Sequence, residues 1–214
     1  GLPPTASYPE INRHDTLGER PENTFKIISV GRLSPEKNIG SLLQALADPR
    51  LESYSVHLFV VGEGGLRRTL ERQAATLNLS SRVSFLGYRS DVTKLMKSMN
   101  LLVMPSLTEG LPITLLEAMR CGLPVLASAV GGIPAALDQG RAGILVKKAS
   151  EAELYDMLCA VISGHIDTKQ LALHAQQRFN LVYSAEAMTK GYINIYEGLI
   201  GSAGKEEKER GESY

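Results

Sequence analysis

Short apolar runs alternate with longer amphipathic segments through the first 150 residues, and this alternation constrains the fold more than any other feature. The runs consist largely of β-branched and aliphatic residues, as buried strands do, and they span residues 25–30, 55–61, 83–86, 101–104, 124–128 and 142–146. Segments such as 39–46 and 66–77 repeat apolar residues at helical spacing. Strands that alternate with helices predict an α/β fold with a parallel sheet of about six strands flanked by helices.

The last third of the chain carries no further strand pattern. Helical periodicity with apolar faces continues through 151–162, 168–180 and 185–200, so we expect a helical C-terminal part packed over the sheet. Four residues recur there at near-helical spacing and are expected in the core rather than at a cofactor: Tyr183, Met188, Tyr192 and Tyr196.

Composition at the two ends of the chain differs from that of its middle. Residues 1–24 are rich in proline and polar residues and are expected to form a linker or lead-in. Residues 201–214 are charged, lack an apolar face and are expected to form a disordered tail. The pattern predicts one domain over residues 25–200.

The charge balance excludes several classes of partner. Lys plus Arg and Asp plus Glu number 23 each among the 214 residues, so no basic field predicts nucleic-acid binding. No apolar run reaches membrane-spanning length, and the scattered histidines and cysteines do not have metal-ligand spacing. Two cysteines, Cys121 and Cys159, together with the lack of a secretory leader, favour a cytoplasmic protein.

The segment between the strand at 101–104 and the next predicted helix carries the most distinctive chemistry. Gly110 permits close approach of backbone to a ligand, and Pro112 suits a first helical turn. The amides that follow, from Ile113 through Thr114 and Leu115 to Leu116, are expected to be free and to face outward. A helix start of this kind binds phosphate without a metal.

Two carboxylates, Glu109 and Glu117, flank this helix start. Because the side chain of a helical residue leans back toward the helix N-terminus, Glu117 can reach the same crevice as Glu109. Each carboxylate can accept two hydroxyls, which suits a polyol on one side of a phosphate and a ribose on the other. The alternative is that Glu117 merely complements the helix dipole and Glu109 is a solvated loop residue.

The two glutamates have Glu-x7-Glu spacing within the run Pro-Ser-Leu-Thr-Glu-Gly-Leu-Pro-Ile-Thr-Leu-Leu-Glu-Ala-Met. This run is followed by Cys-Gly-Leu-Pro-Val-Leu-Ala-Ser and by Gly131-Gly132-Ile133-Pro134. The combination resembles family 4 of the retaining glycosyltransferases. The resemblance covers about residues 25–200 and only the C-terminal, donor-binding half of those two-domain enzymes. It implies a Rossmann-like domain of the B-type glycosyltransferase fold. Leu111 stands where relatives often carry an aromatic residue, which leaves the shape of the sugar pocket open.

The loop after the first strand contains the run Gly-Arg-Leu-x-x-x-Lys-Asn, beginning at Gly31. A loop that follows a parallel strand lies at the carboxyl edge of the sheet, so Arg32 and Lys37 can face a ligand there. In isolation both residues would more often be surface charges. The resemblance identifies this run as the phosphate-binding loop, with Arg32 and Lys37 on the diphosphate.

The resemblance implies that two further turns contribute to the nucleotide pocket. It implies that the turn after the second strand closes the floor of the nucleotide pocket, with Gly62 and Gly64 as backbone contacts, although a tight turn explains these glycines equally well. It also implies that the base lies over the turn Gly87-Tyr88-Arg89, where Tyr88 could stack on the base, although packing in the wall is the preferred interpretation. Asp91 occupies the expected N-cap position of the following helix.

The resemblance implies transfer of a sugar from a nucleoside diphosphate sugar, a UDP- or GDP-sugar, to a hydroxyl acceptor with retention, in glycan or polysaccharide biosynthesis. Glu109 would hold sugar hydroxyls and Glu117 the ribose, without a metal or other cofactor. The acceptor, a glycan or lipid-linked sugar, would bind an N-terminal domain that this sequence lacks, and the full enzyme could work at the cytoplasmic membrane face. Two alternatives remain open, one half of a sugar-nucleotide epimerase and a non-catalytic nucleotide-binding scaffold.

Overall fold

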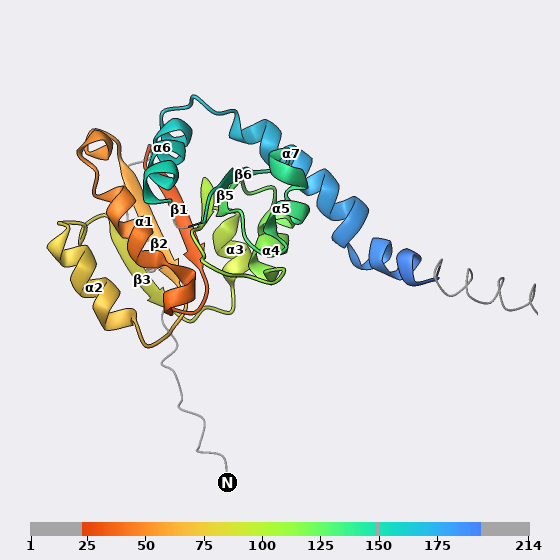
Figure 1. Cartoon of the computed structure of the whole chain (residues 1–214), viewed down its shortest axis with the longest axis horizontal. Coiled ribbons are helices and arrows are strands. Elements are labelled where there is room, and N and C mark those ends of the chain that lie inside the picture. Colours follow the sequence, from red (N-terminus) through yellow and green to blue (C-terminus); the bar gives the residue numbers. More distant parts are fainter. Residues whose placement is uncertain (1–22, 149, 194–214) are drawn as a thin grey trace, which may run out of the picture.

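The computed structural model describes residues 23–148 and 150–193, which form a parallel sheet with helices on both faces (Figure 1). The six strands have the order β3-β2-β1-β4-β5-β6, which is that of a doubly wound Rossmann-like sheet. They are β1 (Phe25–Val30), β2 (Val56–Val61), β3 (Val83–Gly87), β4 (Leu101–Met104), β5 (Val125–Ser128) and β6 (Ile144–Val146). The structure confirms the predicted fold class.

Two sets of helices cover the two faces of the sheet. One hydrophobic cluster joins the sheet to α1 (Ile39–Leu46), α2 (Arg67–Thr76) and α6 (Glu151–Ile162). A second cluster joins the opposite face to α3 (Val92–Met96), α4 (Ile113–Cys121), α5 (Ile133–Ala136) and α7 (Thr168–Arg178). Short 3-10 turns lie at Pro35–Lys37, Pro49–Leu51 and Asp138–Gly140. No helix in these described stretches is long and apolar enough to cross a membrane.

Neighbouring residues of a strand contribute to opposite clusters. Ile27 and Ile28 are both fully buried, the first against α1, α2 and α6 and the second against the helices of the other face. Burial on both faces explains why the strands are continuous apolar runs rather than alternating ones. The same burial fixes the position of each strand along its axis in the sheet, and therefore the place where the loop at its carboxyl end begins.

The strand order reverses between β1 and β4. β1 pairs with β2 on one side and with β4 on the other, all in parallel. The chain leaves β1 toward β2 and leaves β4 toward β5, so the loops after β1 and β4 diverge from the same point. Doubly wound sheets bind ligands outside this switch point.

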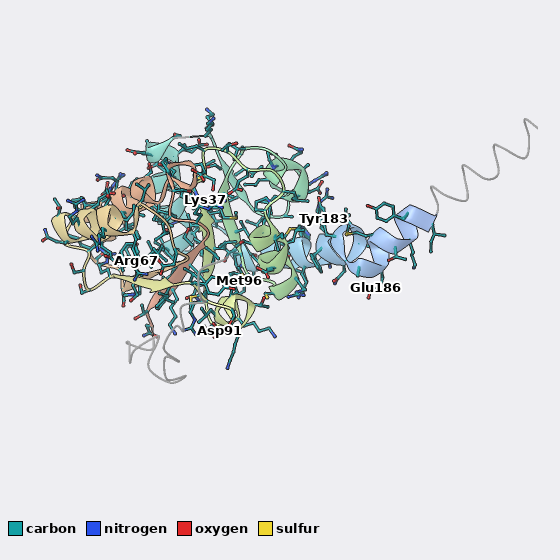
Figure 2. All side chains as sticks on the ribbon, turned by 90° about the horizontal axis from the view of Figure 1, so that it is seen from below. Lys37, Arg67, Asp91, Met96, Tyr183 and Glu186 are labelled. Carbon is teal, nitrogen blue, oxygen red and sulfur yellow. The ribbon has the colours of Figure 1, made fainter. Side chains whose placement is uncertain are left out.

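The C-terminal helices differ from the expected packing. After α7 the chain forms a π-helical turn, Phe179–Tyr183, and residues 185–193 are helical again and project from the body of the domain (Figures 1 and 2). Met188 is 51% exposed and Tyr192 is 59% exposed, so the prediction that both lie in the core is wrong. Tyr183 is partly buried against the α4 side of the sheet. Tyr196 and the predicted tail lie outside the described residues, as does almost all of the predicted lead-in.

Candidate functional site

The carboxyl ends of β1 and β4 bring Lys37 and Glu109 together. Lys37 Nζ lies 2.5 Å from Glu109 Oε1, although 72 residues separate the two in sequence. The Glu109 side chain is 8% exposed and that of Lys37 22% exposed, so water screens this ion pair only in part. A backbone hydrogen bond from the Leu107 amide to the Glu36 carbonyl, 2.7 Å long, joins the same two loops.

Ser106 is a further member of this cluster that the sequence interpretation missed. Its hydroxyl donates to Glu109 Oε1 at 2.8 Å, and the residue is 2% exposed. The spacing of three residues between Ser106 and Glu109 is a signal that could have found the contact, because serine commonly bonds to nearby groups in the same turn.

The turn after β5 holds the main chain of Glu109 and Gly110. The Gly132 amide donates to the Gly110 carbonyl at 2.7 Å. Gly131 has a φ of +56°, and a Cβ there would lie 1.8 Å from the carbonyl oxygen of Glu109. The two glycines therefore serve a close approach of one loop to another, so no ligand is needed to explain them.

The start of α4 is next to this cluster. Pro112 precedes the helix as its N-cap, and its carbonyl accepts the amides of Leu115 at 3.1 Å and of Leu116 at 3.4 Å. The expectation that these two amides are free is wrong, because the helix begins with a tight turn that satisfies them. No backbone hydrogen bond in the described structure uses the amides of Ile113 and Thr114, so these two donors remain for an anion.

Residues around the α4 start leave an open, partly apolar surface. A Cβ at Gly110 would meet no atom within 4 Å, so the surrounding protein does not require glycine there. The side chains of Leu111 and Ile113 are 45% and 74% exposed. Exposed apolar residues beside free amides make this edge accessible to a ligand or to a second domain.

Arg32 and Glu117 differ from Lys37 and Glu109 in having no partner. Arg32 is exposed and Glu117 is half-buried in α4, and neither side chain forms a hydrogen bond or ion pair within residues 23–148 and 150–193. The expected roles of both residues toward a ligand stay predictions.

The glycines after β1 and β2 have a packing reason of their own. A Cβ on Gly62 would lie 1.9 Å from the Gly31 carbonyl oxygen, and one on Gly64 would lie 2.3 Å from that of Leu33. At Gly31 itself, a Cβ would lie 3.3 Å from Cε of Lys37, whose aliphatic chain crosses this glycine. The three glycines thus let the two loops and Lys37 pack closely, and their contact with a ligand stays a prediction.

The turn after β3 is held by ion pairs. Arg89 binds both carboxylate oxygens of Asp91, at 2.8 and 2.7 Å, and this hydrogen bonding lowers the pKa of Asp91. Asp91 precedes α3 as predicted, but its carboxylate binds Arg89 and does not cap the helix. Tyr88 is 74% exposed, so its alternative role as wall packing within this domain is wrong and stacking stays a prediction.

Arg67 supports the same turn from α2 and was also missed. It binds Glu63 at 2.5 Å and Glu71 at 2.9 Å, and it donates to the Phe85 carbonyl at 3.2 Å. These carboxylates raise the pKa of Arg67.

Lys37 and Arg67 both lie on the body of the domain, whereas Glu186 lies on the projecting helical segment, residues 185–193 (Figure 2).

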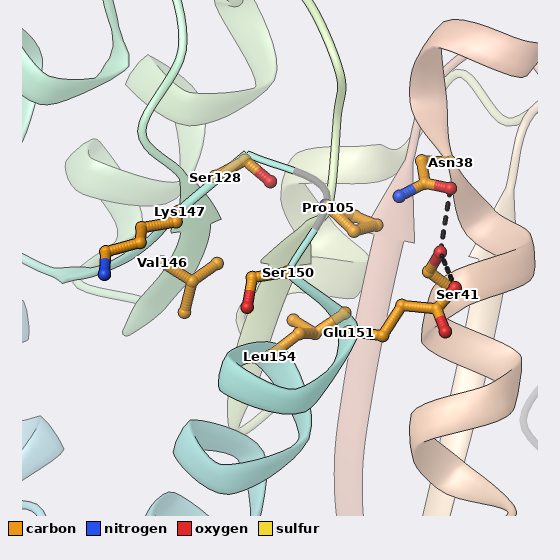
Figure 3. A pocket seen from close by; sticks show the side chains of 9 residues that line it. All are labelled: Asn38, Ser41, Pro105, Ser128, Val146, Lys147, Ser150, Glu151 and Leu154. Atoms are coloured by element: carbon orange, nitrogen blue, oxygen red, sulfur yellow. Dashed lines mark hydrogen bonds between the residues drawn. The ribbon is translucent and has the colours of Figure 1, made fainter.

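A small cavity lies at the carboxyl edge of the sheet, between α1 and the start of α6 (Figure 3). Ser41 Oγ lies 2.9 Å from Asn38 Oδ1 and 2.8 Å from Glu151 Oε1, which ties the two helices together. The volume of about 10 Å³ suits one water molecule. The cavity is thus too small for a ligand much larger than water.

The described histidines lie away from the loops of Lys37 and Glu109. No group of three or more metal-ligating side chains occurs within the described ranges. His57 is buried in β2 beside Ser84, and His165 and His174 lie at α6 and α7. Among described histidines, none lies in the loops that carry Lys37 and Glu109.

Comparison with known proteins identifies the family. The sequence pattern of the family described as glycosyl transferases group 1 matches residues 12–178. An uncharacterized glycosyltransferase of Methanocaldococcus jannaschii is 30% identical over 92% of this chain and 50% of its own length. The D-inositol 3-phosphate glycosyltransferase of Mycobacterium tuberculosis is 32% identical over 85% of this chain and 39% of its own length. The chain therefore spans half or less of the length of these two relatives.

A solved structure shows the same architecture. The crystal structure of Anabaena HepE in complex with UDP has a TM-score of 0.74 and 28% identity over 82% of this chain and 49% of HepE. HepE has also been solved with UDP-glucose. From its sequence match and its fold, the chain belongs to the glycosyl transferases group 1 family.

Proposed function

We propose that this chain is the donor-binding half of a glycosyltransferase that moves a sugar from a nucleoside diphosphate sugar to a hydroxyl acceptor, with retention at the anomeric carbon. The observation that carries the proposal is the contact of Lys37 with Glu109 beside the free amides of α4. The Lys37 ammonium, the Glu109 carboxylate and two amide N–H groups lie around the start of α4. A cation and amide donors suit a diphosphate, and a carboxylate suits the hydroxyls of a sugar joined to it. The complexes of HepE with UDP and UDP-glucose favour a UDP-sugar over a GDP-sugar.

The diphosphate would lie at the start of α4. Arg32 and Lys37 would meet its charge from one side, and the amides of Ile113 and Thr114 would meet it from the other. When the glycosidic bond to the diphosphate breaks, negative charge grows on the leaving group. Fixed cations and amides stabilise that charge without having to reorganise.

The sugar and the ribose would be held by the two carboxylates. Glu109, beside Lys37, would accept sugar hydroxyls, and Glu117, which has no partner in the described structure, would accept those of the ribose. The base would lie toward the turn of Tyr88 and Arg89. A set of backbone positions would complete the walls: Gly31, Gly62, Gly64, Gly110, Leu111, Pro112 and Leu115.

The acceptor would bind the part of the protein that this chain does not span. Transfer requires that the acceptor hydroxyl be held near the anomeric carbon, which needs a second wall. We propose a glycan or lipid-linked sugar as acceptor, in polysaccharide biosynthesis at the cytoplasmic membrane face. Cys121 and Cys159 are both free thiols, which agrees with a reducing compartment.

A binding panel tests the donor assignment. We expect UDP and UDP-sugars to raise the melting temperature of the chain more than GDP- or ADP-sugars, because a ligand that binds the folded state stabilises it by mass action. Without the second wall, affinity should be weak, on the order of 0.1 to a few mM. No shift with any nucleotide at 10 mM, confirmed by calorimetry, would contradict the proposal.

Activity separates the enzyme from its alternatives. The chain alone should transfer no labelled sugar. The full-length protein should form a product whose anomeric configuration, read by NMR, matches that of the donor. Glu109→Ala should abolish this product. Interconversion of nucleotide sugars would indicate an epimerase, and binding without any turnover by the full-length protein would indicate a scaffold.

A further inference from the structure

The two donors that hold Glu109 bind the same oxygen of its carboxylate. Lys37 Nζ and Ser106 Oγ both donate to Oε1, at 2.5 and 2.8 Å. Oε2 accepts no hydrogen bond from the described residues, and it is not among the buried side-chain atoms that lack a partner, so part of its surface reaches solvent. The carboxylate is thus fixed through one oxygen and offers the other.

The main chain that carries this carboxylate is fixed as well. The Gly132 amide donates to the Gly110 carbonyl, and Gly131 packs so closely on the Glu109 carbonyl that a Cβ at residue 131 would lie 1.8 Å from its oxygen. With the backbone held, the orientation of the Glu109 side chain depends on its two donors. Lys37 cannot fix this orientation alone, because a primary ammonium is a point charge on a flexible stem.

Ser106 has the properties of an orienting group. Its side chain is short and buried, and Ser106 lies only two residues after the end of β4, so its hydroxyl has little freedom. Lys37 also has three N–H donors and uses one on Glu109, which leaves two for a diphosphate. Lys37 can therefore bind Glu109 and a diphosphate together, and binding the nucleotide need not disturb the bond from Ser106.

We propose that Ser106 is a positioning residue for sugar recognition, which sets the Glu109 carboxylate so that Oε2 accepts a hydroxyl of the donor sugar. This inference rests on the proposed role of Glu109. Ser106 would act on the sugar alone and not on the nucleotide. It would thereby make a sugar-bearing donor distinguishable from the bare diphosphate.

The test compares two ligands on each variant by calorimetry, UDP-glucose and UDP, or the best-binding pair from the panel. The quantity measured is the ratio of the Kd of the nucleotide sugar to that of the nucleoside diphosphate. Loss of one orienting hydrogen bond should raise this ratio by about threefold to tenfold in Ser106→Ala. The Kd of UDP should change by less than about twofold, since UDP makes no contact with Glu109 in this scheme.

Ser29→Ala is the matched control. Ser29 is also a buried serine, 3% exposed, and its hydroxyl donates to the Val103 carbonyl at 2.9 Å, away from any carboxylate. In Ser29→Ala the ratio of the two Kd values should stay at the wild-type value, even if the melting temperature of the variant falls. Ser106→Thr, which retains the hydroxyl, should restore the ratio toward wild type.

Glu109→Ala separates the two levels of the proposal. A raised ratio in Glu109→Ala but an unchanged ratio in Ser106→Ala would overturn the role of Ser106 and leave that of Glu109. An unchanged ratio in both variants would overturn the sugar role of Glu109 and with it this inference. An equal rise in the Kd of both ligands in Ser106→Ala would mean a structural role only, and would also overturn the proposal.

Discussion

Glu109 and Glu117 are two carboxylates on either side of one helix start, and the structure treats them in opposite ways. Glu109 is nearly buried, paired with Lys37, bonded by Ser106 and fixed through its main chain. Glu117 is half-buried and has no partner within the described parts of the chain. In the proposed function, the carboxylate assigned to the sugar is therefore held before the ligand arrives, whereas the one assigned to the ribose would gain its partner from the ligand.

The largest effect on stability should come from filling the space between Gly131 and the Glu109 carbonyl. Gly131→Val places a side chain against the Glu109 carbonyl at a positive φ, so it should lower the free energy of unfolding by about 3 kcal/mol or more. The control is Gly65→Ala, because a Cβ at Gly65 meets no atom within 4 Å. Urea unfolding of both variants measures the difference, and equal stability would show that the turn does not constrain Glu109.

Lys37→Met retains the aliphatic chain over Gly31 but removes the charge. It should weaken the binding of the nucleoside diphosphate by about 1.5–3 kcal/mol and also lower stability, because it leaves the Glu109 carboxylate partly buried without its cation. Arg32→Gln should weaken binding without lowering stability, since Arg32 is exposed and forms no ion pair with the described residues. In both variants the loss of affinity should shrink as salt rises. Equal weakening of the bare nucleoside would contradict a diphosphate role.

Glu117→Ala tests the other side of the comparison. Binding of UDP should weaken by on the order of 1.5–3 kcal/mol, the cost of losing a charged hydrogen bond to the ribose. The free energy of unfolding should change by less than about 0.5 kcal/mol, because the Glu117 side chain forms no hydrogen bond or ion pair with the described residues. Unchanged affinity by calorimetry would return Glu117 to the role of complementing the helix dipole.

The smallest effect concerns Asp91, which lies beside the turn after β3. Its pKa is lowered in the folded state by Arg89, so its contribution to stability is present above the unfolded pKa and is lost as pH falls through the folded one. The Asp91 side chain is 39% exposed, so screening keeps this contribution below about 1 kcal/mol. Asp91→Asn should therefore flatten the fall of stability below about pH 4. An unchanged pH profile would show that the ion pair contributes nothing.

The strands were predictable because each carries its own local signal. The run predicted at 55–61 is found as Val56–Val61, and burial on both faces explains its continuous apolar character. The contacts of Glu109 with Lys37 and Gly131 had no such local signal, since both residues reach it from other loops, whereas Ser106 lies only three residues away in sequence. Gly31, Gly62 and Gly64 pack against neighbouring loops, a reason for glycine that the sequence does not specify, and their contact with a ligand stays a prediction. Met188 and Tyr192 show the same limit: the spacing of apolar residues predicts an apolar helix face, but not whether another part of the protein packs on that face.

A crystal structure of this chain with UDP tests the central claim most directly. We predict that the β-phosphate lies within hydrogen-bond distance of Lys37 Nζ and of the amides of Ile113 and Thr114. The ribose hydroxyls should bind the Glu117 carboxylate, and the bond from Ser106 to Glu109 should be unchanged. A nucleotide bound elsewhere, or a diphosphate that does not contact the start of α4, would contradict the account.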